Sequence, residues 1–320
     1  MIRTAVVGAG IMGANHVRVL GSLPGSDLVA VVDASEERAR AAAGEGTLVF
    51  PTVGAMLADL PPGHRPEAVV VSTPTSTHHP VATELIEAGL HVLIEKPIAS
   101  TVQEGADLQE RADRAGVILA VGHIERFNAA AQELLRTLDG PLHIEARRIG
   151  PFSSRVPESV VNDLMIHDLD LVSALVDRPV VHVSAVAQSV KTETEDMVTA
   201  LLRFEGGVTA SVIASRLGQQ KIRQLEVTTP DAYVVADLLR QDITITKVEH
   251  TEYVSTDGTR YRQTAAVEIP FLEHRGEPLA AELRSFLDAI NTGDQPAVTA
   301  ADGIRALELV ESVLAAVRSS

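Results

Sequence analysis

Short apolar runs alternate with helix-like segments from residue 3 to about residue 123. The runs at residues 4–7, 28–33, 68–72, 91–95 and 117–122 are rich in Val, Ile and Leu and contain few polar positions. Such runs are typical of parallel strands that are covered on both faces. Segments between them, such as 80–88 and 102–115, have the apolar spacing of helices. We therefore expect an α/β fold here, with a doubly wound parallel sheet.

After residue 123 the pattern changes to a series of longer strands. Two helical stretches, 129–138 and 164–176, precede expected strands at 179–190, 197–204, 208–214, 222–228, 233–237 and 243–248, and the patterns at 279–291 and 300–317 are again helical. This order indicates an α+β domain with a large, mostly antiparallel open sheet. We expect two domains, residues 1–123 and 124–320.

Composition and charge narrow the classes of function. The chain contains no cysteine, which excludes disulfides, thiolate metal sites and cysteine nucleophiles. A net charge of −16 argues against nucleic acid and anionic membranes as partners, because both are bound mainly through Lys and Arg. Because no signal-peptide pattern or long apolar run is present, we expect a cytoplasmic protein.

A glycine-rich turn follows the first expected strand. It reads Gly8-Ala9-Gly10-Ile11-Met12-Gly13 and opens a helical pattern, and Asp33 ends the second strand twenty positions later. This context is typical of a Rossmann domain that holds the cofactor pyrophosphate at a helix N-terminus and the ribose on the acidic residue. Asp33 favours NAD because it would repel a 2′-phosphate, although Arg38 keeps NADP open as the less favoured cofactor.

Two further places carry candidate chemistry. Lys96, in Glu95-Lys96-Pro97, follows a strand at the carboxyl edge of the expected sheet, where open α/β folds bind ligands, although a surface lysine would fit the same spacing. Asp163 and His167 lie four residues apart, and hence on one face of a helix. A histidine that titrates near neutrality can take the proton of an alcohol during oxidation. Alternatively, the two residues only contact each other on the surface of a helix.

These motifs together resemble one family, that of glucose-fructose oxidoreductase, inositol dehydrogenase and MocA. The resemblance covers nearly the whole chain and is carried by the glycine turn, Ser72-Thr73-Pro74 with His78, Glu95-Lys96-Pro97 and Asp163-x-x-x-His167. It implies an NAD-dependent dehydrogenase whose second domain binds the substrate and forms a homodimer or homotetramer through its sheet.

The resemblance also implies roles for individual residues. It makes Lys96 the active-site lysine, His167 the acid or base and Asp163 its companion. The cofactor would be bound by Gly8, Gly10, Ile11, Met12, Gly13, Asp33, Ser72, Thr73, Pro74, His78, Glu95 and Lys96. No metal is expected, because the adjacent His78 and His79 cannot easily share one ion.

The sequences of two segments, 122–128 and 147–152, resemble those of one branch of the family, whose members oxidise the 3-hydroxyl of UDP-N-acetylglucosamine. The candidate substrate ligands are Asn128 and three arginines, Arg147, Arg148 and Arg155, whose guanidinium forks suit a diphosphate. Alternatively these arginines are solvated, or strand geometry sends Arg147 and Arg148 to opposite faces. Two other functions stay open: a cyclitol or free-sugar dehydrogenase of the inositol type, and a catalytically silent NAD-responsive binding protein.

Overall fold

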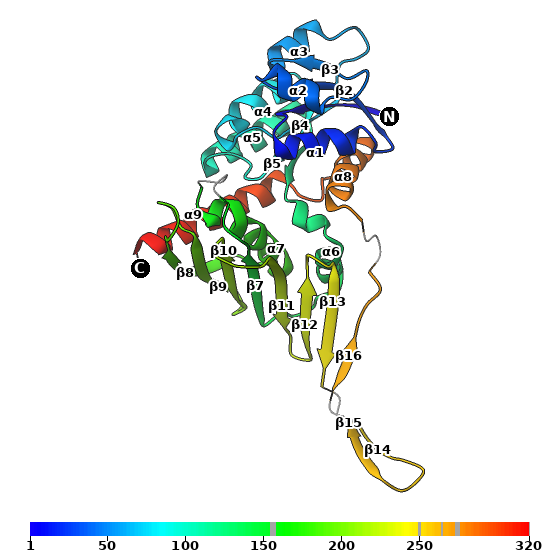
Figure 1. Ribbon diagram of the computed structural model, residues 1–320, viewed down its shortest axis with the longest axis vertical. Helices are drawn as coiled ribbons and strands as arrows, with labels where there is room; N and C mark the ends of the chain where they lie inside the picture. Colours follow the sequence, from blue (N-terminus) through cyan, green and yellow to red (C-terminus); the bar gives the residue numbers. More distant parts are fainter. Residues whose placement is uncertain (154–157, 249–250, 264, 273–275, 320) are drawn as a thin grey trace. The chain divides into compact units, whose positions relative to one another are not determined.

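The chain forms two compact units in the computed structural model, which describes all residues except 154–157, 249–250, 264, 273–275 and 320. The first unit comprises Met1–Phe127 and Gly276–Glu308, and the second comprises Asn128–Arg275 and Leu309–Ser320. Each unit has its own sheet (Figure 1).

The first unit is built on a six-stranded sheet in the order β3-β2-β1-β4-β5-β6, and every neighbouring pair is parallel. Its strands are β1 (Ile2–Val7), β2 (Ser26–Val32), β3 (Leu48–Phe50), β4 (Ala68–Val71), β5 (His91–Glu95) and β6 (Leu119–Gly122). The strand order reverses at β1, as in a doubly wound fold. The predicted Rossmann architecture is therefore confirmed, while the short strand β3 was not expected.

Helices cover both faces of this sheet. They are α1 (Ile11–Leu20), α2 (Glu36–Ala42), α3 (Val53–Asp59), α4 (His78–Glu87), α5 (Val102–Ala115) and α8 (Pro278–Thr292), with short 3-10 turns η1 (Thr75–Thr77) and η2 (Ile124–Phe127). One apolar core joins the sheet to α1 and α8 through side chains such as Val17 and Phe286, and a second joins it to α3, α4 and α5 through Met56, Leu85 and Leu108. Burial on both faces explains why the strands are apolar almost throughout.

Helix α8 shows where the expected domain division differs from the compact units. We placed all of residues 124–320 in the second domain, but α8 packs on the first sheet through Leu279, Leu283, Phe286 and Leu287. These residues recur at helical spacing and form one apolar stripe. Periodicity predicts such a stripe, but it does not identify the sheet that the stripe will cover.

The second unit contains an eight-stranded sheet in the order β16-β13-β12-β11-β7-β10-β9-β8. Its strands are β7 (His143–Ile149), β8 (Val180–Gln188), β9 (Met197–Phe204), β10 (Thr209–Ser215), β11 (Ile222–Thr228), β12 (Ala232–Asp237), β13 (Asp242–Lys247) and β16 (Ala266–Glu268). Among these strands only β7 and β10 pair in parallel. The predicted mostly antiparallel sheet is confirmed, and β14 (Thr251–Val254) and β15 (Arg260–Gln263) form a separate hairpin.

The helices of this unit are α6 (Ala129–Thr137), the π-turn η3 (Val161–Met165) and α7 (Ile166–Val176), and α9 (Ala300–Ser319) contributes its last part. Strand β7 lies at the centre of the sheet but was not predicted, because its sequence HIEARRI is half charged. Its burial nevertheless alternates, with Ile144, Ala146 and Arg148 buried. None of the helices that the structure describes is long and apolar enough to cross a membrane.

Candidate functional site

The glycine turn between β1 and α1 is shaped by close backbone contacts. Gly8 has a φ of +94°, and a Cβ there would lie 2.4 Å from the carbonyl oxygen of Ser72, while a Cβ on Gly13 would lie 1.7 Å from the carbonyl oxygen of Gly8. A Cβ on Gly10 would meet no protein atom within 4 Å. Gly8 and Gly13 therefore close the turn, whereas Gly10 leaves open space at a helix N-terminus, as a bound pyrophosphate requires.

Asp33 lies at the carboxyl end of β2 and is held in place by several donors. Its Oδ2 accepts a hydrogen bond from the backbone N–H of Ala9 (2.7 Å), and its Oδ1 accepts from the N–H of Ser35 (2.7 Å) and from Arg38 (2.8 Å). Burial alone would raise the pKa of Asp33, but the bonds from Arg38, Ser35 and Ala9 lower it. An ionised carboxylate beside the glycine turn fits the ribose hydroxyls of NAD.

Other expected cofactor residues surround the same turn. Ile11 and Met12 lie in the first turn of α1 and are 73% and 37% exposed, so both are accessible to a ligand at the turn. Ser72, Thr73 and Pro74 follow β4 and are at least partly accessible. The turn and Asp33 therefore fit the dinucleotide that the sequence predicts.

His78 differs from these residues because its side chain is buried. Its Nδ1 lies 2.8 Å from the carbonyl oxygen of Pro97, and its Nε2 lies 2.9 Å from the carbonyl oxygen of Thr73. Burial lowers the pKa of His78, while the two carbonyl contacts act in the opposite direction. The ring thus ties the segment after β4 to the segment after β5.

Glu95 and Lys96 end β5, and the Lys96–Pro97 peptide bond is cis. The Glu95 carboxylate points into the protein, where its Oε1 accepts a hydrogen bond from Nε2 of His16 (2.7 Å) and its Oε2 accepts one from the backbone N–H of Lys96 (3.2 Å). Burial would raise the pKa of Glu95, but His16 and Lys96 lower it. Glu95 therefore supports the backbone of the predicted catalytic lysine from the interior.

Glu282 on α8 is a buried carboxyl group that sequence reasoning missed. Neither of its carboxyl oxygens has a hydrogen-bond partner among the described residues. Burial and the negative charge of Glu95 raise the pKa of Glu282 well above its usual value. Its neutral form is therefore the one that this site favours, because an unpaired buried carboxylate is very costly.

Asp163 and His167 lie at the junction between η3 and α7, and both side chains are half-buried. The backbone N–H of Ile166 donates to the carbonyl oxygen of Val161, five residues earlier, which is the hydrogen bond that defines a π-turn. Asp163 is therefore on a π-turn rather than on the regular α-helix that the sequence predicted. Such insertions are frequent at functional sites because they re-aim side chains.

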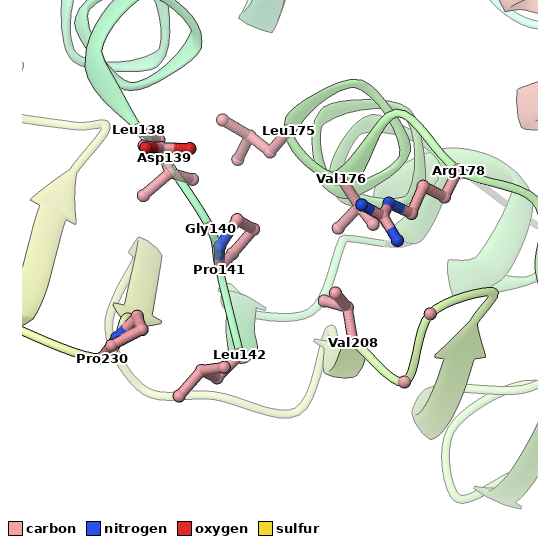
Figure 2. Close-up of a pocket in the computed structure, with 12 residues that line it drawn as sticks. Leu138, Asp139, Gly140, Pro141, Leu142, Leu175, Val176, Arg178, Val208 and Pro230 are labelled. Atoms are coloured by element: carbon pink, nitrogen blue, oxygen red, sulfur yellow. The ribbon is translucent and has the colours of Figure 1, made fainter.

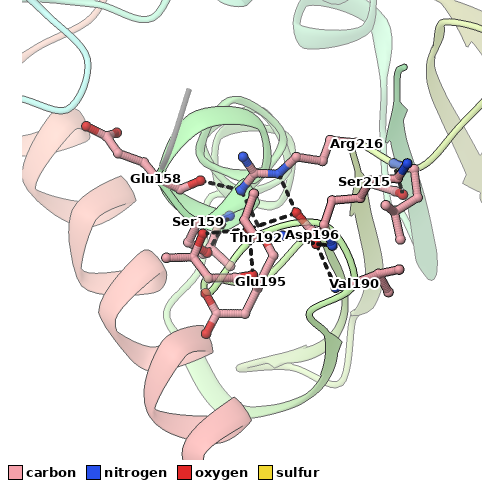
Figure 3. Close-up of polar contacts among 12 residues, drawn as sticks. Glu158, Ser159, Val190, Thr192, Glu195, Asp196, Ser215 and Arg216 are labelled. Atoms are coloured by element: carbon pink, nitrogen blue, oxygen red, sulfur yellow. Dashed lines mark hydrogen bonds and ion pairs between the residues drawn. The ribbon is translucent and has the colours of Figure 1, made fainter. Parts of the chain in front are cut away.

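Arg216, just after β10, anchors the segment that leads into η3 (Figure 3). Its guanidinium donates to the carbonyl oxygens of Glu158 and Glu195 and lies 3.2 Å from Oδ1 of Asp196. Burial would raise the pKa of Asp196, but donors from the loop at residues 190–192 lower it strongly. The ionised pair fixes the approach to the π-turn that carries Asp163.

The structure separates the expected substrate residues. Arg147 is on the face of the sheet opposite Arg148, where it donates to Gln224 (2.7 Å) and to Glu226 (2.5 Å). Asn128 is 3% exposed, and both polar atoms of its side-chain amide form hydrogen bonds: the oxygen caps α6, and the nitrogen donates to the carbonyl oxygen of Leu238. Arg155 lies outside the described residues.

Arg148 remains near the predicted catalytic residues but is engaged in a buried ion pair. Its Nε and terminal nitrogen donate to the two carboxylate oxygens of Asp168 at 2.8 and 2.9 Å, and both side chains are almost fully buried. Arg148 therefore joins the central strand to α7, beside His167. Pairing with the acid offsets the positive charge that we had assigned to a diphosphate.

A cavity of about 300 Å³ lies at the carboxyl end of β7 and is lined by Asp163. Four of its eleven lining residues are Lys or Arg, whereas the whole chain has 27 such residues in 320. The basic residues are Arg148, Arg216, Lys221 and Arg223. Sequence reasoning missed the last three because they are far from the recognised motifs, and only the sheet brings them to Asp163.

A larger hollow of about 590 Å³ lies toward the amino end of β7 (Figure 2). Leu138, Leu142 and Val208 line it together with two charged residues, Asp139 and Arg178. It contains none of the residues predicted to act in catalysis. The cavity that Asp163 lines is therefore the stronger candidate for substrate in this unit.

Comparison with known proteins gives the family. Residues 2–123 match the GFO/IDH/MocA oxidoreductase family with its NAD-binding Rossmann fold, and residues 145–234 match a GFO/IDH/MocA C-terminal domain. UDP-N-acetylglucosamine 3-dehydrogenase of Acidithiobacillus ferrooxidans is 35% identical over 292 residues, which cover 90% of this chain and 88% of that protein. A solved structure of that enzyme matches with a TM-score of 0.89 and 34% identity, covering 99% of this chain and 98% of the other.

Inositol 2-dehydrogenase 1 of Saccharopolyspora erythraea is also similar, with 29% identity over 335 residues that cover 98% of this chain and 94% of the relative. The matches span both units. The chain therefore belongs to the GFO/IDH/MocA family, as an NAD-binding oxidoreductase of the sugar-dehydrogenase type.

Proposed function

We propose that this enzyme oxidises the 3-hydroxyl of a UDP-N-acetylhexosamine, with NAD as the acceptor. The observation that carries the proposal is the similarity to UDP-N-acetylglucosamine 3-dehydrogenase, which extends over 90% of the chain. The inositol dehydrogenase is less similar, at 29% identity. A cavity rich in Lys and Arg beside Asp163 supports an anionic substrate in an otherwise acidic protein.

In the proposed mechanism, His167 accepts the proton of the reacting hydroxyl group, because a neutral imidazole is a suitable base near neutral pH. Asp163 orients the imidazole or a neighbouring sugar hydroxyl. The Lys96 ammonium stabilises the negative charge that develops on the oxygen. NAD held by the first unit would supply the acceptor for the hydride that leaves the oxidised carbon.

The first unit is proposed to hold the cofactor through the glycine turn and Asp33. Gly10 allows the pyrophosphate to approach the N–H groups at the start of α1, and the carboxylate of Asp33 accepts hydrogen bonds from the ribose. Ser72, Thr73 and Pro74 complete the same edge of the sheet. His78 and Glu95 act from the interior, as positioning residues for the segments that carry Thr73 and Lys96.

The uncovered face of the second sheet is proposed to bind a second copy of the chain. Val186, Leu201 and Tyr233 project from this face and are 61%, 53% and 42% exposed. Val186 and Leu201 lie on the neighbouring strands β8 and β9, and Tyr233 lies on β12 of the same sheet; exposed apolar side chains on one face are typical of interfaces. A homodimer or homotetramer formed through this sheet would bury them.

The substrate proposal is tested by following NADH formation with four compounds: UDP-N-acetylglucosamine, UDP-glucose, glucose and myo-inositol. Turnover with UDP-N-acetylglucosamine, and a product oxidised at carbon 3 by NMR, is expected. Turnover with only myo-inositol or glucose would overturn the proposal and would favour the cyclitol or free-sugar alternative. Activity with UDP-glucose alone would support a UDP-sugar as substrate but would refute the proposal that its sugar is an N-acetylhexosamine.

A further inference from the structure

We propose that Lys221 and Arg223 bind the diphosphate of the substrate in the cavity at the carboxyl end of β7. This inference rests on the proposed function, and it gives these two residues the role that the sequence had suggested for Arg147, Arg148 and Arg155. Both line the cavity, and Lys221 is exposed while Arg223 is half-buried. No acidic partner for Lys221 is present among the described residues.

The sheet register explains how Arg223 reaches this place. Arg223 on β11 directly faces Arg148 on β7, and the next pair on the same face is Leu225 with Ala146, both buried. Like charges at facing positions of a sheet repel one another. Asp168 pairs with Arg148, and an anion bound beside the two guanidinium groups would reduce the repulsion between them.

The other walls of the cavity match the rest of a nucleotide sugar. Asp163 is part of the lining, so a diphosphate held by Lys221 and Arg223 leaves its attached sugar close to a proposed catalytic residue. Phe152 also lines the cavity and is 39% exposed; Nζ of Lys191 lies over one face of its ring, 5.7 Å from the centroid, so a base would stack on the other face. The volume of about 300 Å³ is at the lower end for ligand pockets, in keeping with a site for one part of a larger ligand.

The inference is tested by calorimetric titration of UDP into the full-length protein in the presence of saturating NAD, so that the cofactor site is already filled. The variants are Lys221→Gln, Arg223→Gln and the double variant, and Arg240→Gln is the matched control because its side chain is 80% exposed and does not line the cavity. Each single variant should weaken UDP binding about tenfold, as expected for one lost charge-assisted contact. The control should bind as the wild type does.

Titration of uridine, which lacks the diphosphate, distinguishes the contribution of the diphosphate to binding from that of the base. The affinity for uridine should be the same in the wild type and in the Lys221 and Arg223 variants, whereas Phe152→Leu should weaken uridine and UDP alike. UDP binding that is absent, or that is unaffected by the double variant, would overturn the inference. Lys221 is exposed, so its replacement tests the site without disturbing the core.

Kinetics distinguish this inference from the proposed function. If the enzyme oxidises UDP-N-acetylglucosamine and the double variant keeps the wild-type KM, the function holds and the assignment of the diphosphate site is wrong. If UDP binds through Lys221 and Arg223 but UDP-N-acetylglucosamine is not oxidised, the site holds and the proposed reaction is wrong. Both hold if KM rises about tenfold or more in the double variant while kcat changes little.

Discussion

Arg148 and Asp168 form a bidentate ion pair, with N–O distances of 2.8 and 2.9 Å and side chains that are 3% and 2% exposed. The pair connects the central strand β7 to helix α7, and Asp168 directly follows His167. Its geometry gives two parallel charge-assisted hydrogen bonds in a site from which water is excluded. The position of the proposed base therefore depends on a contact between residues twenty positions apart.

Replacing Arg148 by Met should destabilise the protein by about 3–5 kcal/mol, because the Asp168 carboxylate is left buried without its partner. The free energy of unfolding from urea denaturation measures the effect. The double variant Arg148→Met, Asp168→Leu should recover most of the loss, since an apolar pair can replace a buried ion pair. If the single and double variants are equally unstable, packing rather than charge is the main contribution of this contact.

Replacing Lys96 by Ala should abolish most turnover and change NAD binding little, because the glycine turn and Asp33 are proposed to hold most of the dinucleotide. The expected decrease in kcat is about a hundred- to a thousandfold, the usual cost of losing a group that stabilises developing charge. NADH affinity, measured by its own fluorescence, should stay close to that of the wild type. Lys247→Ala is a suitable control because this half-buried lysine on β13 pairs with Glu268 on β16, outside the site. Retained turnover in Lys96→Ala would refute the assignment.

Two glycines of the turn should respond differently to the same change. Gly10→Ala should fold normally, because its Cβ meets no protein atom within 4 Å, but it should weaken NAD binding about tenfold by filling the space that the pyrophosphate needs. Gly13→Ala should lower Tm as well, because its Cβ would lie 1.7 Å from the carbonyl oxygen of Gly8. Thermal unfolding without cofactor and calorimetry with NAD separate the two effects. Unchanged NAD affinity in Gly10→Ala would place the pyrophosphate elsewhere.

Glu282→Gln should make the protein more stable at neutral pH. Burial, reinforced by Glu95, raises the pKa of Glu282 in the folded state, so the folded protein holds a proton that the unfolded chain releases above a pH of about 4.3. Stability contributed by this group is therefore fully present below that pH and is lost as pH rises, at up to about 1.4 kcal/mol per pH unit.

Tm measured from pH 4 to pH 8 checks this expectation. The wild type and Glu282→Gln should have similar Tm values near pH 4, and the Tm of the variant should exceed that of the wild type increasingly as the pH rises. Asp288→Asn, a change to an exposed residue on the same helix, is the control. Parallel Tm curves for Glu282→Gln and the wild type would show that Glu282 is ionised in the folded protein.

The sequence alone determined the architecture and the cofactor class. Apolar runs covered on both faces, the glycine turn and Asp33 are local signals, because each depends on residues that are close together in the chain. The family followed from the order of motifs around Lys96 and His167, and the alternative of a catalytically silent binding protein is not supported by relatives that are named dehydrogenases.

Only the tertiary structure decided which charged side chains face which partners. Arg147 and Arg148 look equivalent in sequence, but strand alternation sends one to Glu226 on the open face and the other to Asp168 in the interior. Lys221 and Arg223 lie far from Asp163 in the chain and line the same cavity because β11 pairs with β7. The physical reason is that neither strand pairing nor the docking of α8 leaves a local signal: both depend on contacts between segments that are distant in the chain.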